Sequence, residues 1–328
     1  MQERFDTTPK IKTSRLNVLP QNPESDQPDQ TVGPGRFPSW LHRKLPKGTE
    51  LRQTSQIVTD NRLHTVCEEA KCPNLLECWS KKTATFLVLG KECTRNCGFC
   101  SIDFAKAPKD LDPEEPLRVA QSVKALGLKH VVITMVARDD LTDGGSAHLV
   151  AVVQAIRQEN SDITVEVLTS DFDGNQTAWQ HILSAQPDIF NHNVETVREL
   201  TPRVRHKATY ERTLAFLRYM KERTTGTHTL IKSGLMVGLG ETEEQVFATI
   251  KDLKASGCAI ITIGQYLQPD PKKLRVKSFV HPSQFQKYEE FGYAQGIAYM
   301  YCGPFVRSSY NANLVLKKAN EHIHIINS

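Results

Sequence analysis

HVVITMV, residues 130–136, is typical of a buried β-strand because β-branched and other apolar residues dominate it. The segment after it, SAHLVAVVQAIRQE (146–159), has the apolar spacing of a helix. The segment before it, EPLRVAQSVKALG (115–127), is a second predicted helix that ends on Gly127, a residue suited to a helix C-cap. Helix, buried strand and helix in succession indicate a parallel sheet with right-handed crossovers.

The same alternation continues on both sides of this stretch. We predict further strands at 84–90, 162–170, 188–195, 228–240 and 259–268, and further helices at 175–185, 209–222, 242–257 and 281–296. Six βα units in a row fit either a partial (β/α)6 TIM-type barrel or a doubly wound sheet. Periodicity does not choose between the two.

The pattern divides the chain into four parts. Residues 1–36 are predicted to be a flexible N-terminal arm, because 17–36 are rich in Pro, Gln, Asp and Gly. An ordered N-terminal extension is expected at 37–83, the α/β domain at 84–300 and a C-terminal extension at 301–328.

Composition narrows the class of protein. Hydrophobic residues make up 39% and charged residues 24% of the 328 residues, and the formal net charge is only +4. Basic and acidic residues are nearly matched, which argues against a nucleic-acid-binding protein. No apolar run is long enough to cross a bilayer, and the first twenty residues have no apolar signal-peptide core. We therefore expect a cytoplasmic protein with neither nucleic acid nor a membrane as its partner.

Six of the eight cysteines lie between residues 67 and 100. In a reducing compartment, such close spacing indicates metal binding rather than disulfides. The other two, Cys258 and Cys302, have no partners at metal-ligand spacing, and we interpret them as small buried apolar side chains.

CTRNCGFC (93–100) holds Cys93, Cys97 and Cys100 but no fourth cysteine. It follows the first predicted strand, and active sites of parallel α/β proteins lie at the carboxyl ends of strands. A structural zinc ion requires four ligands, whereas three thiolates on a [4Fe–4S] cluster leave one iron open to a substrate or cofactor. We favour the open cluster; the alternative is a zinc ion completed by a distant His or Cys.

LHTVCEEAKCPNLLECW (63–79) contains a second triplet, Cys67, Cys72 and Cys78, with Cx4Cx5C spacing. Again three ligands are present without a fourth. The alternatives are a structural zinc site or three unrelated core cysteines.

The CxxxCxxC loop, with Phe99 as the aromatic residue before its last cysteine, resembles the signature of the radical S-adenosylmethionine (SAM) superfamily. The resemblance implies a partial barrel in which Cys93, Cys97 and Cys100 bind a [4Fe–4S] cluster. It further implies that the open iron binds the amino and carboxylate groups of SAM. Reduction of SAM would then yield a radical that removes hydrogen from unactivated C–H bonds.

Within that superfamily, the chain resembles the lipoyl synthase family over residues 38–312. The similarity lies in the Cx4Cx5C segment, in RSSY (307–310), in VARDDLTDGG (136–145) and in FNHNVETV (190–197). It implies that Cys67, Cys72, Cys78 and Ser309 bind an auxiliary [4Fe–4S] cluster.

The family resemblance also implies a reaction and partners. Two sulfur atoms from the auxiliary cluster, which is consumed, would enter at C6 and C8 of an octanoyl chain attached to a lysine of a lipoyl carrier domain. Expected carriers are 2-oxoacid dehydrogenase E2 subunits and the glycine cleavage H protein. The expected electron donor is a flavodoxin or a ferredoxin.

The same resemblance implies contacts to SAM, and we expect no catalytic side chain beyond the cluster ligands. Candidates are Phe99 in the cysteine loop, Thr134 and Arg138 after the second strand, Asn193 and Glu195 after the fourth, and Gly238 in GLMVGLGE (234–241). Four of them have a simpler alternative: a helix-cap network for Asn193 and Glu195, a surface arginine for Arg138, and a turn for Gly238.

Two other functions remain open at this level. One is a different two-cluster radical SAM enzyme, either biotin-synthase-like or methylthiolating. The other is a zinc-stabilised RNA-binding module, which the low aromatic content of 7% disfavours.

Overall fold

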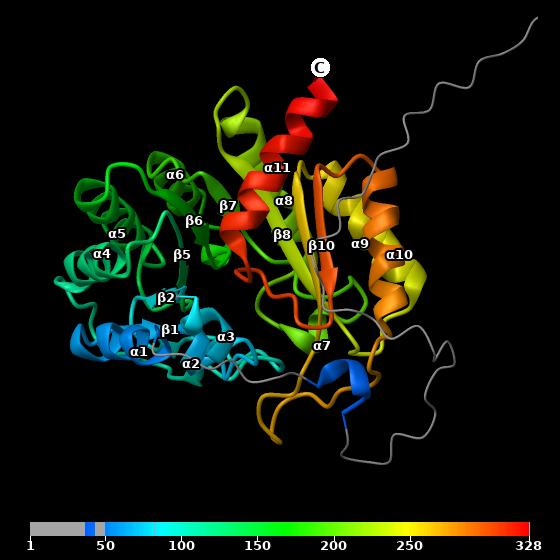
Figure 1. The fold of residues 1–328 in the computed structure, drawn as a ribbon, viewed down its shortest axis with the longest axis horizontal. Coiled ribbons are helices and arrows are strands. Elements are labelled where there is room, and N and C mark those ends of the chain that lie inside the picture. The colour runs from blue at the N-terminus through cyan, green and yellow to red at the C-terminus, as the bar shows by residue number, and fades with distance from the viewer. Residues whose placement is uncertain (1–36, 43–49, 82, 328) are drawn as a thin grey trace, which may run out of the picture. The chain divides into compact units, whose positions relative to one another are not determined.

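The computed structural model describes residues 37–42, 50–81 and 83–327 (Figure 1). The chain divides into Met1–Pro38 and a compact unit, Ser39–Ser328. The arm predicted for residues 1–36 lies outside the described residues.

A single parallel sheet forms the centre of this unit. Its strands pair in chain order: β2 (Thr85–Val88), β5 (His130–Met135), β6 (Thr164–Leu168), β7 (Ile189–Asn191), β8 (Leu230–Val237), β9 (Ile260–Gln265) and β10 (Tyr299–Gly303). A short strand, β1 (His64–Thr65), is antiparallel to β2 at one edge. Among the described strands, β1 and β10 end the order without pairing to each other, so the sheet stays open, as in a partial barrel.

Each predicted strand–helix unit is present. The helices are α4 (Glu115–Leu126), α5 (Ser146–Glu159), α6 (Gln176–Ser184), α8 (Tyr210–Thr224), α9 (Glu243–Ala255) and α10 (Pro282–Ala294), and Figure 1 shows them outside the strands. Gly127 is the left-handed C-cap of α4, and Thr242 closes a capping box at the start of α9. The strand predicted at 188–195 is too long, because after Asn191 the chain turns and Glu195 adopts a φ of +66°.

Two elements after α10 were not predicted. β10 adds a seventh parallel strand and crosses the boundary suggested at residue 300. α11 (Ala312–Asn327) contacts both β10 and β5. Its Val315 and Ala319 pack in one apolar cluster with Ile189, Ile260 and Tyr299, which lie at the first or second residue of their strands. α11 therefore covers the amino-terminal end of the barrel interior.

Successive side chains of a strand point to opposite faces, and here the two faces differ in polarity. Val131, Ile133, Val165 and Val167 belong to the main apolar core, which also contains the helices. The residues between them on each strand therefore face the interior, and many are polar or lack a side chain: Thr134, Glu166, Asn191, Lys232, Gly234, Thr262 and Gly264. The open barrel thus encloses a polar interior.

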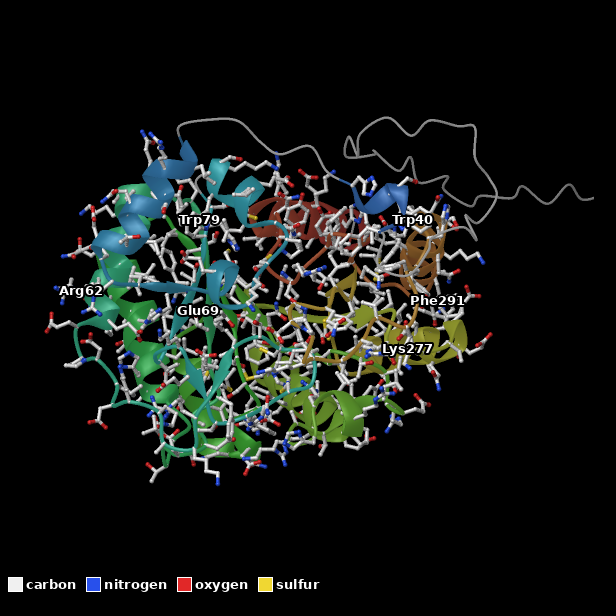
Figure 2. The ribbon with its side chains drawn as sticks, turned by 90° about the horizontal axis from the view of Figure 1, so that it is seen from below. Trp40, Arg62, Glu69, Trp79, Lys277 and Phe291 are labelled. Carbon is white, nitrogen blue, oxygen red and sulfur yellow. The ribbon has the colours of Figure 1, made fainter. Side chains whose placement is uncertain are left out.

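The N-terminal extension consists of η1 (Ser39–Leu41), α1 (Glu50–Asp60), α2 (Val66–Glu69) and α3 (Leu75–Ser80). Thr54 on α1 donates to the carbonyl of Trp79, and the Arg118 guanidinium of α4 donates to the carbonyl of Asn61. Figure 2 labels Arg62, Glu69 and Trp79 in this extension. Within the described ranges, no helix combines the length and apolarity needed to cross a bilayer.

Candidate active site

The first cysteine triplet lies in the loop that leaves β2, as the sequence predicts. This loop contains β3 (Glu92–Cys93), which pairs with β4 (Asp103–Phe104). The amide of Thr94 donates to the carbonyl of Ala137 at 3.0 Å, and the amide of Gly98 donates to the carbonyl of Val204 at 2.9 Å. Backbone hydrogen bonds to two other segments, those that contain Ala137 and Val204, therefore hold the loop at the carboxyl end of the sheet.

The three thiols of this loop are half-buried and act on one another electrostatically. Burial, followed by the neighbouring thiols, raises the pKa of Cys97 to about 11 and that of Cys100 to about 12. A buried, protonated thiol becomes a thiolate when a metal cation replaces the proton. The donor set of three sulfurs with nearby Arg205 and Arg95 therefore fits an anionic iron–sulfur cluster.

The second triplet spans α2 and α3. Cys67 is buried against Trp79, and burial, opposed by a backbone hydrogen bond and reinforced by Cys72 and Cys78, raises the pKa of its thiol to about 12. In the ranges that the structure covers, no three His, Cys, Asp or Glu side chains converge as ligands of a single metal ion. In a cubane each thiolate binds a different iron, so its ligands need not converge on one point.

The C-terminal RSSY segment lies against this second triplet. Asn74 donates from Nδ2 to the carbonyl of Phe305 at 2.8 Å, and the Tyr310 hydroxyl donates to Glu77 at 2.7 Å. Asn74 and Glu77 lie between Cys72 and Cys78, so both ends of the 305–310 segment contact the stretch that carries the cysteines. The tertiary structure thereby brings the segment that contains Ser309 against the stretch that carries the second triplet, across more than 230 residues of sequence.

Glycines make room for this segment inside the barrel. A Cβ on Gly264 would overlap the carbonyl oxygen of Val306, and a Cβ on Gly234 would meet Thr262, Asn193 and Ser308. Residues 306–308 therefore enter the interior over two adjacent strands that lack side chains at these points.

Replacement of Gly264 by alanine is expected to expel this segment. The added methyl would meet the Val306 backbone, which cannot rotate away as a side chain can. Overpacking of this kind costs about 1–3 kcal/mol, so the melting temperature of the metal-free protein should fall. Alanine at Gly303 is the control, because Gly303 also lacks a positive φ and its added Cβ would meet only the Val306 side chain, at 3.3 Å. A Gly264→Ala protein that equals Gly303→Ala in stability would contradict the close approach.

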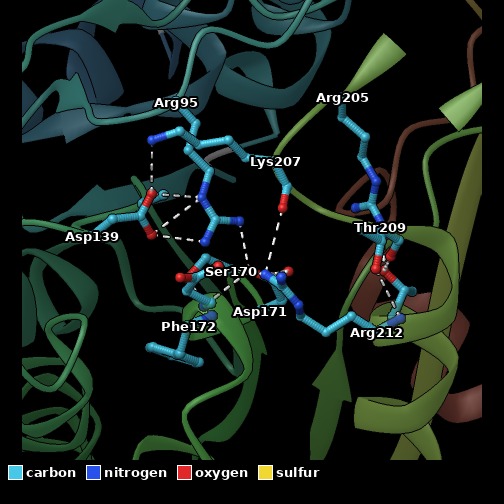
Figure 3. Close-up of polar contacts among 12 residues, drawn as sticks. Arg95, Asp139, Ser170, Asp171, Phe172, Arg205, Lys207, Thr209 and Arg212 are labelled. Atoms are coloured by element: carbon cyan, nitrogen blue, oxygen red, sulfur yellow. Dashed lines mark hydrogen bonds and ion pairs between the residues drawn. The ribbon is translucent and has the colours of Figure 1, made fainter. Parts of the chain in front are cut away.

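The cysteine loop is clamped by a buried arginine that the sequence reasoning missed. Arg95 is 5% exposed and pairs with Asp139 at 2.7 Å and with Asp171 at 2.5 Å (Figure 3). Arg212 approaches the other oxygen of Asp171 at 3.1 Å. Burial by itself would raise the pKa of Asp171, but its neighbours, Arg95 first among them and then Arg212, together hold this pKa below its usual value. The clamp joins the loops that follow β2, β5 and β6.

Asn193 and Glu195 lie beside the cysteine loop. Asn193 accepts a hydrogen bond from the Ser308 hydroxyl at 2.8 Å and donates to Glu195 at 3.1 Å. Burial raises the pKa of Glu195, although Arg205 and Asn193 oppose the shift, and Glu195 also acts electrostatically on Cys97.

Arg205, also missed by the sequence reasoning, completes this group. It donates to the carbonyl of Asn193 at 2.8 Å and bonds to Thr213, while its buried Nε has no hydrogen-bond partner among the described residues. An unsatisfied buried donor beside the cysteine loop is suited to an anionic or carbonyl oxygen of a bound molecule.

The structure also places the other residues that are predicted to contact SAM. Phe99 packs in an apolar cluster with Leu239 and Tyr266, and Leu239 is the residue after Gly238. Gly238 has a φ of +97°, and the amides of Gly238 and Leu239 donate to the Glu241 carboxylate. Thr134 is buried on β5.

Arg138 is a buried residue rather than a surface arginine, at 2% exposure. Two of its nitrogens donate to Asp140, at 2.9 and 2.8 Å, and a third donates to the carbonyl of Leu89 at 3.3 Å. Its guanidinium is therefore already engaged by the protein, and a SAM carboxylate would have to share it.

His192, which lies near this site, makes the free energy of unfolding depend on pH. Its ring contacts the Thr169 carbonyl at 2.8 Å and the Thr213 hydroxyl at 3.2 Å, and burial lowers its pKa from 6.5 to about 4. Between pH 4 and 6.5 the unfolded chain therefore binds a proton that the folded chain does not. His192 therefore contributes a rise in stability with pH of about 3 kcal/mol across this window, while Glu289, whose pKa burial raises to about 7, contributes in the opposite sense.

We expect His192 to make the denaturant midpoint of the metal-free protein rise from pH 4.5 to pH 6.5 relative to a protein that lacks this imidazole. His192→Asn, which retains a donor for Thr169, should remove most of that slope. An unchanged slope in this variant would assign the pH dependence to other groups.

Comparisons with known proteins agree with this geometry. Residues 87–253 match the model of the radical SAM superfamily, and residues 18–72 match that of the N-terminal domain of lipoyl synthase. The chain is 68% identical to a lipoyl synthase of Protochlamydia amoebophila (strain UWE25), over 97% of this chain and 98% of that protein. It is 50% identical to a lipoyl synthase of Chlamydia muridarum, over 92% and 97% of the two chains.

Solved structures resemble the chain in fold. Methylornithine synthase aligns with a TM-score of 0.50 and 14% identity, over 76% of this chain and 71% of that one. HydG, a maturase of the [FeFe]-hydrogenase, aligns with a TM-score of 0.52 and 16% identity, over 70% and 53% of the two chains. At these identities the likeness concerns the fold alone.

Proposed function

Because the chain belongs to the lipoyl synthase family of the radical SAM superfamily, we propose that it inserts sulfur at C6 and C8 of an octanoyl chain attached to a lysine of a lipoyl carrier domain. The protein is a radical SAM enzyme whose cofactors are SAM and two [4Fe–4S] clusters. When bound, the cofactors supply the one-electron chemistry and the sulfur that no side chain can provide.

Two separate cysteine triplets, which lie in different parts of the structure, support this proposal. Cys93, Cys97 and Cys100 lie in a loop at the carboxyl end of the sheet, and we propose that they bind the SAM cluster. Cys67, Cys72 and Cys78 lie in the extension, against the 305–310 segment. We propose that they bind the auxiliary cluster together with Ser309. One cluster would bind SAM and the other would donate sulfur.

The protein's own residues would bind and orient SAM between these sites. We propose that Asn193 and Glu195, beside Cys97, bind the polar end of SAM together with Arg205, whose free Nε suits a carboxylate. Phe99 and Gly238 would line the adenine side, where the glycine allows close backbone approach. Thr134 and Arg138 would complete the site from β5. The buried interior keeps water away from a reactive radical.

The enzyme acts on lipoyl carrier proteins. We propose E2 subunits of 2-oxoacid dehydrogenases and the glycine cleavage H protein as the carriers, and the cytoplasm as the compartment. A flavodoxin or ferredoxin is the proposed electron donor. We propose that the donor docks over an opening of about 490 Å³ beside the cysteine loop, whose lining includes Lys106 and Lys207 as well as Asp139 and Asp140.

An octanoyl-lysine peptide tests the reaction. The protein, reconstituted anaerobically and supplied with SAM and dithionite, should convert the peptide to a product heavier by two sulfur atoms. SAM cleavage without sulfur gain, or the appearance of a methylthio group, would instead indicate another two-cluster radical SAM enzyme. Omission of SAM is the control and should leave the peptide unchanged.

A further inference from the structure

A fully buried lysine lies inside the barrel. Lys232 on β8 has a side-chain exposure of 0%, and so does its ion-pair partner Glu166 on β6. The ammonium donates to the two carboxylate oxygens of Glu166 at 2.8 and 3.0 Å. Lysine is almost never fully buried unless it is paired, so the carboxylate explains how the charge is tolerated. It does not explain why a charge is there.

Neighbouring side chains orient the Lys232–Glu166 ion pair. Asn191 on β7 donates from Nδ2 to Glu166 at 2.8 Å, and the Nε2 of His130 lies 3.9 Å from the other oxygen. Since an ammonium has three donors and the carboxylate takes two, the third has a defined direction. It points to the carbonyl oxygen of Ser308, at 2.6 Å.

This third hydrogen bond fixes the peptide group that links Ser308 to Ser309. A peptide unit is planar, so fixing the Ser308 carbonyl also fixes the direction of the Ser309 nitrogen and Cα. The Ser308 hydroxyl is held separately by Asn193 at 2.8 Å. Residue 308 is thus anchored through both its backbone and its side chain to the barrel interior. Ser309 is the next residue.

We propose that Lys232 is a positioning residue for Ser309: by holding the Ser308 carbonyl, it presents the Ser309 hydroxyl to the auxiliary cluster. The inference rests on the proposed function, because it assumes that Ser309 is the fourth ligand of that cluster. Without this anchor the three cysteines would still bind iron and sulfide, but the serine-bound iron would be lost more readily.

The test uses variants in a background where Cys93, Cys97 and Cys100 are alanine, so that only the auxiliary cluster forms. Lys232→Met alone would leave Glu166 charged and buried, which by itself endangers folding. The test variant is therefore Glu166→Gln with Lys232→Met, which removes both charges and retains an oxygen for Asn191. Glu166→Gln alone is the matched control: Lys232 then lacks its anion, but a buried lysine can release its proton and still donate to the Ser308 carbonyl as a neutral amine. Ser309→Ala is the reference for loss of the ligand.

Two readouts are compared, and neither requires turnover. The first is iron per chain after anaerobic reconstitution, with the electron paramagnetic resonance spectrum recorded after mild oxidation. We expect about four irons in the background protein and in Glu166→Gln, but about three, with a three-iron signal, in the test variant and in Ser309→Ala. The second is hydrogen exchange of the amides at 308–310 in the metal-free protein. It should be faster in the test variant than in Glu166→Gln.

The possible failures are distinguishable. If Ser309→Ala loses an iron and the test variant keeps four, Lys232 contributes only to structure and the inference is wrong. It is equally wrong if Glu166→Gln alone loses as much iron as the test variant. If Ser309→Ala itself keeps four irons, the ligand role assigned to Ser309 under the proposed function fails, and the inference fails with it.

Discussion

Replacing Cys93, Cys97 and Cys100 together with alanine is expected to halve the iron and sulfide of the anaerobically reconstituted protein, from about eight to about four of each per chain. The same protein should no longer cleave SAM. The reason is that the two triplets lie in separate segments, one after β2 and one across α2 and α3, so the loss of one leaves the other intact. Iron and sulfide assays and SAM cleavage by chromatography measure both effects.

A matched control is available in the other two cysteines. Cys258 and Cys302 belong to, or pack against, the main apolar core, where burial raises the pKa of both thiols. Alanine at both should leave the iron count unchanged. A count near four that falls to zero in the triple variant would leave a single cluster and no sulfur donor. Zinc without sulfide would overturn the assignment of the first triplet.

Arg95→Met is expected to lower the free energy of unfolding of the metal-free protein by about 3–5 kcal/mol, because it breaks a buried ion pair and leaves its partner behind. Asp171 is fully buried and would keep Arg212 as its ion-pair partner, while Asp139 would keep a distant ion pair with Lys207 at 3.9 Å. Denaturant titration under anaerobic conditions measures the effect as a shift in midpoint at constant slope.

An exposed ion pair serves as the comparison. Lys124 and Glu159 lie 3.1 Å apart with side chains 63% and 39% exposed, so Lys124→Met should cost about 0–1 kcal/mol. If Arg95→Met costs no more than this control, the clamp does not stabilise the loop. A second consequence follows from the clamp's position: Arg95→Met should also bind less iron at the first triplet while keeping that of the second.

Local sequence signals predicted much of the fold because they are repeated and strong. The helix predicted at 146–159 has the same bounds in the structure, and Gly127 and Thr242 mark helix ends through their own backbone and side-chain chemistry. β10 escaped prediction because Tyr299–Gly303 is short and its pairing partner, β9, lies more than thirty residues earlier. Strand pairing is a non-local property that five residues do not encode.

In the candidate site, too, local features were predictable from the sequence and non-local contacts were not. Cysteine spacing is a local signal, so both triplets were identified from the sequence. Arg95, Arg205 and Lys232 were not, although Lys232 and Glu166 are charged residues within otherwise apolar strands, a signal that could have identified them. Their partners come from other strands and loops, and only the fold shows which charge meets which.

By itself, therefore, the sequence determined the alternation of strands and helices, the two cysteine triplets and the family to which the chain belongs. The tertiary structure alone decided that the 305–310 segment reaches the second triplet, that Arg95 joins three loops, and that Lys232 holds the Ser308 carbonyl. The physical reason is the sequence separation over which each interaction acts. Periodicity, caps and ligand spacing act within a few residues, whereas a buried charge must find its partner wherever folding brings one within hydrogen-bond distance.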